Sequence, residues 1–541
     1  MKRNTDIHRG PLVRSSIVCV ILLGLMALAV NSIINVSSDA EYVAAAIGQS
    51  IYRLDVAKSR GTIYDCHLQP LTSGKGRWIA AVPPTIETIG ALETATGGQY
   101  RQQLALHLED GKPFAMEIDQ PLENDLVDMF RVQERYSQDQ LAPHVVGYLD
   151  SMGGGAAGVE LCMNDALDRH SGEIRIYYQV DALGRVIAGA GRQIVDNMEN
   201  TAGGVAVTID SELQRLAEKA AQRLGRGAVV ITQAPNCEIR AMVSMPDFDP
   251  NDIATAANAS KEDAPLVNRA LCGYAPGSVF KLVTAAAMLE SGAQLKEFDC
   301  TGSINAGGML FKCYDGQPHG KLTLKSAIEK SCNCYFISAA RALGGQPALS
   351  MAYNLGFGTE QEFGRGLFSD QGTLPKAQSL ENSRALANFS FGQGDLTVTP
   401  LQVCGMMNAI VCDGVYSSPK LIQGLVSAEG ELVPQQAISD VSLQAMSKKT
   451  AALLGEYLIS AAKVGTGAKG APEDGVCGIK TGTAQTGVYE NGVELSHFWY
   501  SGFVCDKEGN KYCITVLREG VADDGGVTAS VFKEISQGLV E

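Results

Sequence analysis

Three short motifs in this chain carry side chains that could perform acyl transfer together. The first is Pro276-Gly-Ser-Val-Phe-Lys281, in which Ser278 and Lys281 stand three positions apart. Apolar residues continue to about Glu290, so we expect the motif to open a helix that places both side chains on one face. A buried lysine with a lowered pKa can act as the base that a nucleophilic serine needs. The helix start also offers free backbone N–H groups to an oxyanion.

The second motif is Ser331-Cys-Asn333. The hydroxyl of Ser331 can relay a proton to a leaving group, and the amide of Asn333 can hold a peptide group of a substrate. Alone, either of these first two motifs is weak evidence. A capping serine beside a surface lysine explains the first equally well, and an ordinary turn explains the second.

The third motif, Lys480-Thr-Gly-Thr483, lies in a strand-like run. Gly482 would let an extended substrate lie against the edge of this strand, as in β-strand addition. Lys480, with the hydroxyls of Thr481 and Thr483, offers a cation and donors to a carboxylate. The backbone N–H of Thr483 is a candidate second donor to the oxyanion.

One motif at a helix start, one in a loop and one on a strand, in this order, make the signature set of the penicilloyl serine transferases. Beyond this set, the chain resembles the class B penicillin-binding proteins over nearly its whole length. The segments that carry the resemblance are residues 60–65, 144–148, 158–160, 208–210, 248–251, 268–270, 392–394 and 399–402. One departure is Cys66-His-Leu-Gln69, which replaces a basic continuation of the first segment and leaves the three motifs untouched.

The resemblance implies a peptidoglycan D,D-transpeptidase. Ser278 would attack the penultimate D-Ala carbonyl of a stem pentapeptide, with Lys281 as the base, and D-Ala would leave. An amine on a neighbouring stem would then resolve the acyl-enzyme and form a cross-link. Ser331 and Lys480 would shuttle protons. β-Lactams would acylate the same serine, because they mimic D-Ala-D-Ala.

The resemblance also assigns the groups that bind the substrate. Asn333 would hold the substrate amide, and Thr481 and Thr483, on either side of Gly482, would bind the terminal carboxylate. The resemblance implies no metal and no organic cofactor. The role of such an enzyme in elongation, septation or sporulation stays open at this point, as do its acyl-acceptor amino acid and its oligomeric state.

A partner is implied as well, because the region before residue 200 shows no glutamate-centred motif of a lipid-linked glycan polymerase. Class B proteins work with a polytopic SEDS-family glycosyltransferase. We expect the contact to run through an apolar helix at residues 17–34, where Gly24 and Ala27 are small, and through residues 60–65. Helices associate in a bilayer through packing and polar contacts.

Three other functions compete with this interpretation. A serine β-lactamase of the same fold would need a device that activates a deacylating water, and neither a long N-terminal region nor an anchor is required for it. A β-lactam sensor or a scaffold would keep the site for binding; sensors of this kind resemble the catalytic domain alone. A histidine-dependent hydrolase is disfavoured, because only His497 lies close to a motif and a structural place in its strand explains it.

The predicted elements around the motifs indicate an α+β fold. Five runs are typical of strands, at residues 227–232, 238–245, 478–484, 497–505 and 511–517. Helical patterns flank them at residues 211–224, where Ser211 and Gln214 have capping-box spacing, and at residues 527–540. A mainly helical stretch separates the two strand groups. We therefore expect a five-stranded antiparallel sheet with flanking helices and a helical insert.

The N-terminus carries the clearest targeting signal. Residues 17–34 form a run of eighteen residues without a charge, and this is close to the length that spans a bilayer. Basic residues precede this run, and the next one after it is Arg53, so the positive-inside rule places the N-terminus in the cytoplasm and the rest outside the cell membrane. A cleaved signal peptide, cut near residues 38–40, is the alternative.

The domain boundaries follow from these segments. We expect a cytoplasmic tail at residues 1–16, a single transmembrane anchor at 17–34, a mixed pedestal domain at 35–204 and the transpeptidase domain at 205–541. The net charge of −15, with no lysine- or arginine-rich block, argues against a nucleic-acid partner.

The chain has fourteen cysteines, which is many for an exported protein. No CxxC pair or HExxH suggests a metal site, and nothing near Cys332 and Cys334 in the sequence completes a ligand set. We therefore expect no metal and mostly buried or free thiols. Cys300 and Cys313 are the one predicted disulfide, because they bracket a loop before Ser331 and related proteins pair cysteines at similar places.

Overall fold

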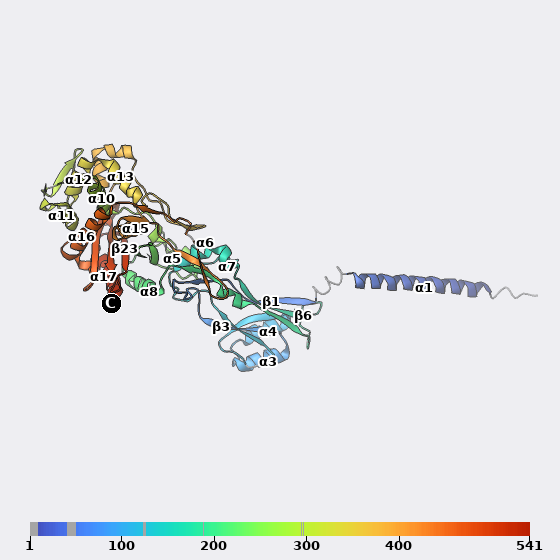
Figure 1. The fold of residues 1–541 in the computed structure, drawn as a ribbon. Coiled ribbons are helices and arrows are strands. Elements are labelled where there is room, and N and C mark those ends of the chain that lie inside the picture. Colours follow the sequence, from blue (N-terminus) through green and yellow to red (C-terminus); the bar gives the residue numbers. More distant parts are fainter. Residues whose placement is uncertain are drawn as a thin grey trace, which may run out of the picture. The chain divides into compact units, whose positions relative to one another are not determined.

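The computed structural model describes residues 9–39, 50–122, 126–187, 189–293, 295, 297–435 and 437–541 (Figure 1). Helix α1 spans Arg9–Ser38 and contains the apolar run predicted at residues 17–34. Within the described residues, Val13–Ser38 is the one helix that is long and apolar enough to cross a bilayer, with a mean hydropathy of 2.7. Lys2 and Arg3, which support the predicted orientation, lie outside the described residues, as does Ala40 of the alternative cleavage site.

The chain folds into two compact units. The first contains Met1–Lys58, Gly76–Gln133 and Gly172–Met198. It has two three-stranded sheets, ordered β1-β6-β7 and β4-β3-β5. Its elements are β1 Ile51–Ser59, β3 Gly76–Val82, α3 Ile86–Ala95, α4 Arg101–Asp110, β4 Phe114–Ile118, β5 Asp128–Gln133, β6 Gly172–Gln179 and β7 Arg192–Asp196. Side chains of both sheets share one apolar core, and the sheet β4-β3-β5 forms a second core with α3 and α4, which contribute Leu92 and Leu104.

The second unit contains Ser59–Lys75, Glu134–Ser171 and Glu199–Glu541. Its main sheet has five strands in the order β10-β9-β23-β22-β21, and every neighbouring pair is antiparallel. The strands are β9 Gly227–Gln233, β10 Glu238–Met245, β21 Val476–Glu490, β22 Val493–Cys505 and β23 Lys511–Val521. All five correspond to predicted strands, and β21 lies at an edge of the sheet.

Helices cover both faces of this sheet, which confirms the predicted α+β class (Figure 1). The alternation of side chains along β9 explains the two layers. Val229 and Ile231 pack against α8 Ser211–Ala221 and α17 Val527–Val540. Ala228 and Val230 face the opposite core, which contains the helical insert.

The helical insert separates β10 from β21. Its helices include η4 Gly277–Phe280, α10 Lys281–Ser291, α11 Leu324–Glu329, α12 Asn333–Leu343, α13 Gly345–Asn354, α14 Ser383–Ser390, α15 Pro400–Val411 and α16 Lys448–Val464. Small strand pairs join them: β11 Phe298–Cys300 with β14 Gly320–Leu322, β12 Ser303–Ala306 with β13 Met309–Lys312, β15 Glu362–Gly364 with β16 Leu367–Phe368, and β17 Val415–Ser417 with β20 Ser442–Gln444.

The predicted capping box of α8 is wrong. Asp210, one residue earlier, is the N-cap, and its carboxylate accepts from the backbone N–H groups of Glu212 and Leu213. Ser211 instead donates its hydroxyl to Asp65 over 2.7 Å. Gln214 is buried and exchanges hydrogen bonds with the backbone of Met242. An aspartate is as good an N-cap as a serine, so spacing alone did not distinguish them.

A second sheet in this unit, ordered β19-β18-β8-β2, combines early and late parts of the chain. Its strands are β2 Thr62–Tyr64, β8 Gly204–Val207, β18 Ile422–Val426 and β19 Leu432–Pro434, and β2 runs parallel to β8. Three short helices lie in the same unit, α5 Pro143–Val146, α6 Gly158–Cys162 and α7 Asn164–Asp168.

A buried ion-pair network holds this region. Glu160 on α6 is fully buried and pairs with Arg135 at 2.7 Å and with Arg60 at 3.7 Å. Tyr136 also donates its hydroxyl to Glu160, over 2.9 Å. Arg60 donates to the side chain and backbone oxygen of Asn164. Three segments distant in the sequence are thereby joined through one carboxylate.

Candidate active site

The serine of the first motif stands on a sharp turn rather than inside an α-helix. Gly277 opens the single 3-10 turn η4 with a φ of +54°, in the left-handed region that favours glycine. A Cβ at this position would lie 2.3 Å from the carbonyl oxygen of Thr483, so no other residue fits. Ser278 follows on η4, and α10 begins at Lys281. The turn therefore brings the serine against strand β21.

Gly482 on β21 makes the second close approach. A Cβ there would lie 2.8 Å from the carbonyl oxygen of Pro276 and 3.1 Å from the side chains of Val279 and Trp499. We predicted that Gly482 leaves room for a substrate; this stays a prediction, and the structure shows that the missing Cβ also leaves room for the serine turn. Trp499 on β22 also donates its indole N–H to the carbonyl oxygen of Ala275, which fixes the chain just before the turn.

Lys281 is fully buried, and its amine lies at the centre of the site. Its Nζ is 2.9 Å from Ser278 Oγ, 2.6 Å from Asn333 Oδ1 and 2.7 Å from the carbonyl oxygen of Ser331. A charged ammonium has three protons and no lone pair, whereas a neutral amine has two protons and one lone pair. A neutral Lys281 can therefore donate to Asn333 and to the Ser331 carbonyl while it accepts from Ser278.

The second motif lies directly before α12. Ser331 has a φ of +51°, a left-handed conformation that a serine rarely adopts. Its Oγ is 3.2 Å from Lys281 Nζ and 2.9 Å from Lys480 Nζ, so this hydroxyl lies between two amines. Asn333 donates its amide N–H to the carbonyl oxygen of Lys312 over 2.9 Å, which orients the amide oxygen toward Lys281.

The third motif forms the part of β21 that borders the site. Lys480 is fully buried and also donates to the carbonyl oxygen of Thr481. Thr481 is half-buried, and its hydroxyl donates to that of Thr466 over 2.8 Å. Thr483 is exposed. Sequence analysis missed Thr466, because it lies in the loop after α16 and belongs to none of the motifs.

Burial determines the protonation of the two lysines. Desolvation lowers the pKa of Lys281 to about 7, although the neighbouring cysteine sulfurs act in the opposite direction. The pKa of Lys480 is also lowered well below its usual value, first by desolvation and then by the charge of Lys281. Burial therefore favours the neutral amine at both lysines, and both amines contact the hydroxyl of Ser331.

The structure thus brings together Ser278, Lys281, Ser331, Asn333 and Lys480, and it places residues 481–483 on the adjacent strand. His497 lies in β22, and its Nδ1 accepts from the backbone N–H of Gly520. Desolvation lowers the pKa of this imidazole. These features agree with a structural place for the histidine.

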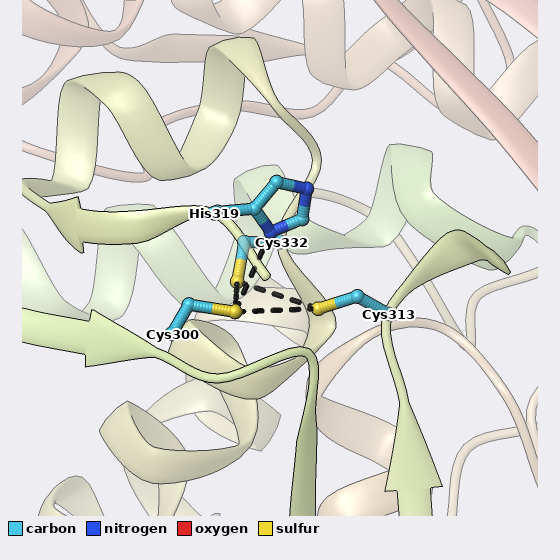
Figure 2. Close-up of side chains that lie close together, drawn as sticks. All are labelled: Cys300, Cys313, His319 and Cys332. Carbon is cyan, nitrogen blue, oxygen red and sulfur yellow. Dashed lines mark hydrogen bonds between the residues drawn. The ribbon is translucent and has the colours of Figure 1, made fainter. Parts of the chain in front are cut away.

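The predicted disulfide is not formed. The Sγ atoms of Cys300 and Cys313 are 3.7 Å apart, whereas a disulfide bond is about 2.05 Å long. Both thiols lie instead in a cluster with Cys332 and His319 (Figure 2). Sequence analysis missed this cluster, because its members are spread over residues 300–332 without the close pairs that mark common metal sites. The available signal was the density of cysteines just before α12.

The fold and this constellation define a class of protein, the active-site serine acyltransferases that carry an SxxK, an SxN and a KTG motif. Comparisons with known proteins agree. Residues 227–537 match the family model described as the penicillin binding protein transpeptidase domain. Because this match covers more than half of the chain, the protein belongs to the penicillin-binding protein transpeptidase family.

Two curated relatives indicate its place in the family. Peptidoglycan D,D-transpeptidase PbpA of Mycolicibacterium smegmatis is 31% identical over 361 residues, which cover 62% of this chain and 71% of PbpA. Stage V sporulation protein D of Bacillus subtilis is 28% identical over 359 residues, which cover 63% of this chain and 53% of that protein.

Solved structures share the fold. Penicillin-binding protein 3 of Mycobacterium tuberculosis in complex with aztreonam has a TM-score of 0.65 at 21% identity, over 90% of this chain and 96% of that one. Penicillin-binding protein A of M. tuberculosis, as a ceftriaxone acyl-enzyme complex, has a TM-score of 0.56 at 28% identity, over 63% of this chain and 80% of that one.

Proposed function

We infer that this protein is a peptidoglycan D,D-transpeptidase that works through an acyl-enzyme on Ser278. The observation that carries this proposal is the buried amine of Lys281, 2.9 Å from Ser278 Oγ, with a pKa lowered to about 7. An amine with this pKa is largely neutral at physiological pH and can take the proton of the serine hydroxyl.

Acylation then follows from the geometry. Ser278 Oγ forms a bond to the penultimate D-Ala carbonyl carbon, and Lys281 takes the hydroxyl proton. The backbone N–H groups of Ser278 and Thr483 are suited to stabilise the oxyanion, because the turn of Gly277 packs against Thr483. When the amide bond breaks, the departing nitrogen needs a proton. Ser331 can pass one to it from Lys281 or Lys480, since its hydroxyl contacts both amines.

The substrate binds along the edge of the sheet. β21 is an edge strand, so an extended stem peptide can pair with it by β-strand addition. Asn333 would hold a peptide amide of the substrate, and the hydroxyls of Thr481 and Thr483 would bind its terminal carboxylate. Thr466 adds a third hydroxyl beside Thr481. In the second half-reaction, an amine of a neighbouring stem attacks the ester and restores the Ser278 hydroxyl.

The relatives support the proposed chemistry over its alternatives. Two curated relatives of similar sequence are named peptidoglycan D,D-transpeptidases, and a neighbour at 28% identity is a β-lactam acyl-enzyme. A serine β-lactamase, a β-lactam sensor and a scaffold remain the alternatives. Turnover of a stem-peptide donor with an amine acceptor distinguishes a transpeptidase from all three.

We also propose the arrangement at the membrane. Helix α1 is the anchor, residues 1–16 lie in the cytoplasm, residues 35–204 act as a pedestal and residues 205–541 carry the transpeptidase outside the cell. A SEDS-family glycosyltransferase would bind through α1, where Gly24 leaves open space on the helix surface, and through the partly exposed Thr62 and Tyr64 of residues 60–65, since Arg60, Ile63 and Asp65 are buried. Loss of co-purification when both regions are replaced, with acylation retained, would test this contact.

Labelling with a fluorescent penicillin tests the nucleophile. We expect the solubilised full-length chain to be labelled covalently and Ser278→Ala to lose the label, because Ser278 Oγ lies 2.9 Å from Lys281 Nζ, closer than the 3.2 Å of Ser331 Oγ. Ser291→Ala, at the far end of α10, is the matched control and should label normally. A labelled Ser278→Ala protein would place the nucleophile elsewhere.

A further inference from the structure

A small β-rich segment stands beside the active site and contains little apolar core of its own. Strand β11 pairs with β14, and β12 pairs with β13 in a hairpin between them. Met309 and Leu310 on β13 are 50% and 57% exposed. Ala306 and Phe311 join only a small apolar cluster with Ile337 and Ala387, so a cross-link or a metal ion would add to a modest core.

Four side chains converge where these strands meet. Figure 2 shows Cys300, Cys313, His319 and Cys332 directed toward one another from separate segments. Cys300 ends β11, Cys313 follows β13, His319 precedes β14 and Cys332 precedes α12. Their ligand atoms all lie within 4.8 Å of one another. The three cysteines are 3% exposed or less.

The spacing of the atoms matches a tetrahedral metal site. The Sγ···Sγ distances are 3.7 Å for Cys300–Cys313, 3.6 Å for Cys313–Cys332 and 3.5 Å for Cys300–Cys332. Zn–S bonds of about 2.3 Å and Zn–N bonds of about 2.0–2.1 Å at tetrahedral angles require S···S separations of about 3.8 Å and S···N separations of about 3.5 Å. Cys300 Sγ and His319 Nδ1 are 3.5 Å apart.

Hydrogen bonds with Cys313 and Cys334, together with burial, raise the pKa of the Cys332 thiol, whereas the start of α12 acts in the opposite direction. Cys332 is the N-cap of α12, and its sulfur accepts from the backbone N–H of Tyr335 over 3.4 Å. The positive end of the helix dipole also stabilises negative charge at this position. The sulfur of Cys334 is also 3.4 Å from that of Cys313. Two disulfides, Cys300–Cys332 and Cys313–Cys334, would therefore use four thiols but leave the imidazole of His319 out. A metal ion uses the imidazole with three thiols and leaves Cys334 as a free thiol.

We propose that Cys300, Cys313, His319 and Cys332 form a structural Zn²⁺ site. Three thiolates and one imidazole nitrogen complete a closed tetrahedral set, which is typical of structural zinc and leaves no open position for catalysis. Binding converts three thiols to thiolates and releases their three protons to solvent, while His319 binds through neutral Nδ1.

The site would fix the geometry of the second catalytic motif. Cys332 is the residue between Ser331 and Asn333, so coordination of its sulfur holds both neighbours. Asn333 also donates to the carbonyl oxygen of Lys312, the residue before Cys313. Two ligands thus flank the groups that contact Lys281. This part of the inference rests on the proposed acylation of Ser278, whereas the metal site itself does not.

Metal content tests the site directly. The full-length chain, isolated in detergent without chelators, should contain about one zinc ion per molecule. Cys300→Ser, Cys313→Ser and His319→Gln should lower zinc retention against a competing chelator by about tenfold or more. Cys404→Ser is the matched control, because Cys404 is equally buried in the same unit but contacts Thr232 and the backbone of Cys513. Zinc at the same low level in wild type and in all ligand variants would overturn the proposal.

A measurement on the unaltered chain covers the case in which a ligand variant fails to fold. After zinc is removed and Co²⁺ is added, the chain should show the charge-transfer and intense visible bands of tetrahedral cobalt bound to thiolates. The spectrum of octahedral cobalt would overturn the site. So would a disulfide that contains any of these three cysteines, Cys313–Cys334 included, in protein alkylated as it leaves its native membrane.

The effect on the active site has its own readout. Removal of zinc should slow penicillin acylation of Ser278 by about tenfold or more, and added Zn²⁺, but not Mg²⁺, should restore the rate. Unchanged acylation after zinc loss would overturn the positioning role and leave the site intact. Absence of acylation in the zinc-loaded chain would contradict the proposed function, while metal content would still report on the site.

Discussion

Two buried networks in the second unit hold cationic side chains away from water, and they balance the charge in opposite ways. Arg60 and Arg135 share the carboxylate of Glu160. Lys281 and Lys480 share the hydroxyl of Ser331, and their other recorded partners in the described residues are neutral oxygens. Arginine cannot lose its proton in a protein, so it needs the carboxylate.

This difference in charge balance separates a structural role from a catalytic one. A buried cation that is paired with a carboxylate stays charged and joins chain segments. A buried amine among neutral partners gives up its proton and becomes a base. The two networks therefore suggest that a catalytic site in this fold is distinguished by a buried amine without a carboxylate partner, and not by the burial of a cationic group alone. Three predictions test this contrast.

The largest effect is expected when the amine of Lys281, which has no carboxylate partner, is removed. Lys281→Met keeps the length of the side chain but cannot accept a proton, so penicillin acylation should fall about 10²- to 10⁴-fold. Stopped-flow or gel-based acylation kinetics measure this, with circular dichroism to show that the variant folds. Lys448→Met, at an exposed ion pair with Asp413, should acylate normally. A loss of less than about tenfold, or about 1.4 kcal/mol of barrier, would mean that another group is the base.

Removal of the compensating charge should affect stability rather than chemistry. Glu160→Gln leaves two buried guanidinium groups without a counter-ion, which should lower the free energy of unfolding by about 3–5 kcal/mol. The folded fraction should still be acylated by penicillin. Glu534→Gln, which breaks the partly exposed pair with Arg223, should cost about 0–1 kcal/mol. Equal losses in the two variants, measured by denaturant unfolding, would show that the Glu160 network has no special role.

The smallest effect is the pH dependence of acylation. Because the pKa of Lys281 is about 7, the rate should rise about tenfold per pH unit below pH 7 and level off above it, as the amine loses its proton. A rate that stays flat through pH 7 would argue against a lysine base.

The same pKa has a consequence for stability. The unfolded chain keeps the ordinary lysine value of 10.5, so it binds more protons than the folded chain between pH 7 and 10.5. The contribution of Lys281 to stability is therefore fully present above the unfolded pKa and is lost as the pH falls toward 7.

The sequence predicted what is local or strongly patterned. Ser278 and Lys281 are three residues apart, and the five strands were recognised by their apolar runs. The ends of β21 and β22 were missed, because residues 485–496 are mostly exposed and their pairing depends on cross-strand hydrogen bonds rather than on burial. Tyr489 pairs with Glu494, for example, without an apolar signal.

The spacing of residues in the sequence could not predict contacts between distant segments of the chain. The segments 60–65 and 158–160 were each recognised from their resemblance to the family, yet nothing in either one indicated that Arg60 and Glu160 pair. The same holds for the close approach of Gly482 to the carbonyl oxygen of Pro276, which nothing in its motif indicated. The cysteine cluster shows the limit most clearly, because its members become neighbours only when β11, β14 and α12 meet.

At Ser331, the stability of the fold and the chemistry of the active site favour different residues. A non-glycine residue with a φ of +51° costs about 1 kcal/mol or more, and glycine would adopt the same backbone without strain. A substitution of Ser331 by glycine would therefore stabilise the fold but remove the hydroxyl that lies between the two amines. Selection for cell-wall synthesis, and not for durability, must retain the serine. In a screen for thermostable variants of this protein, substitutions at Ser331 should appear among the variants that are stable but inactive.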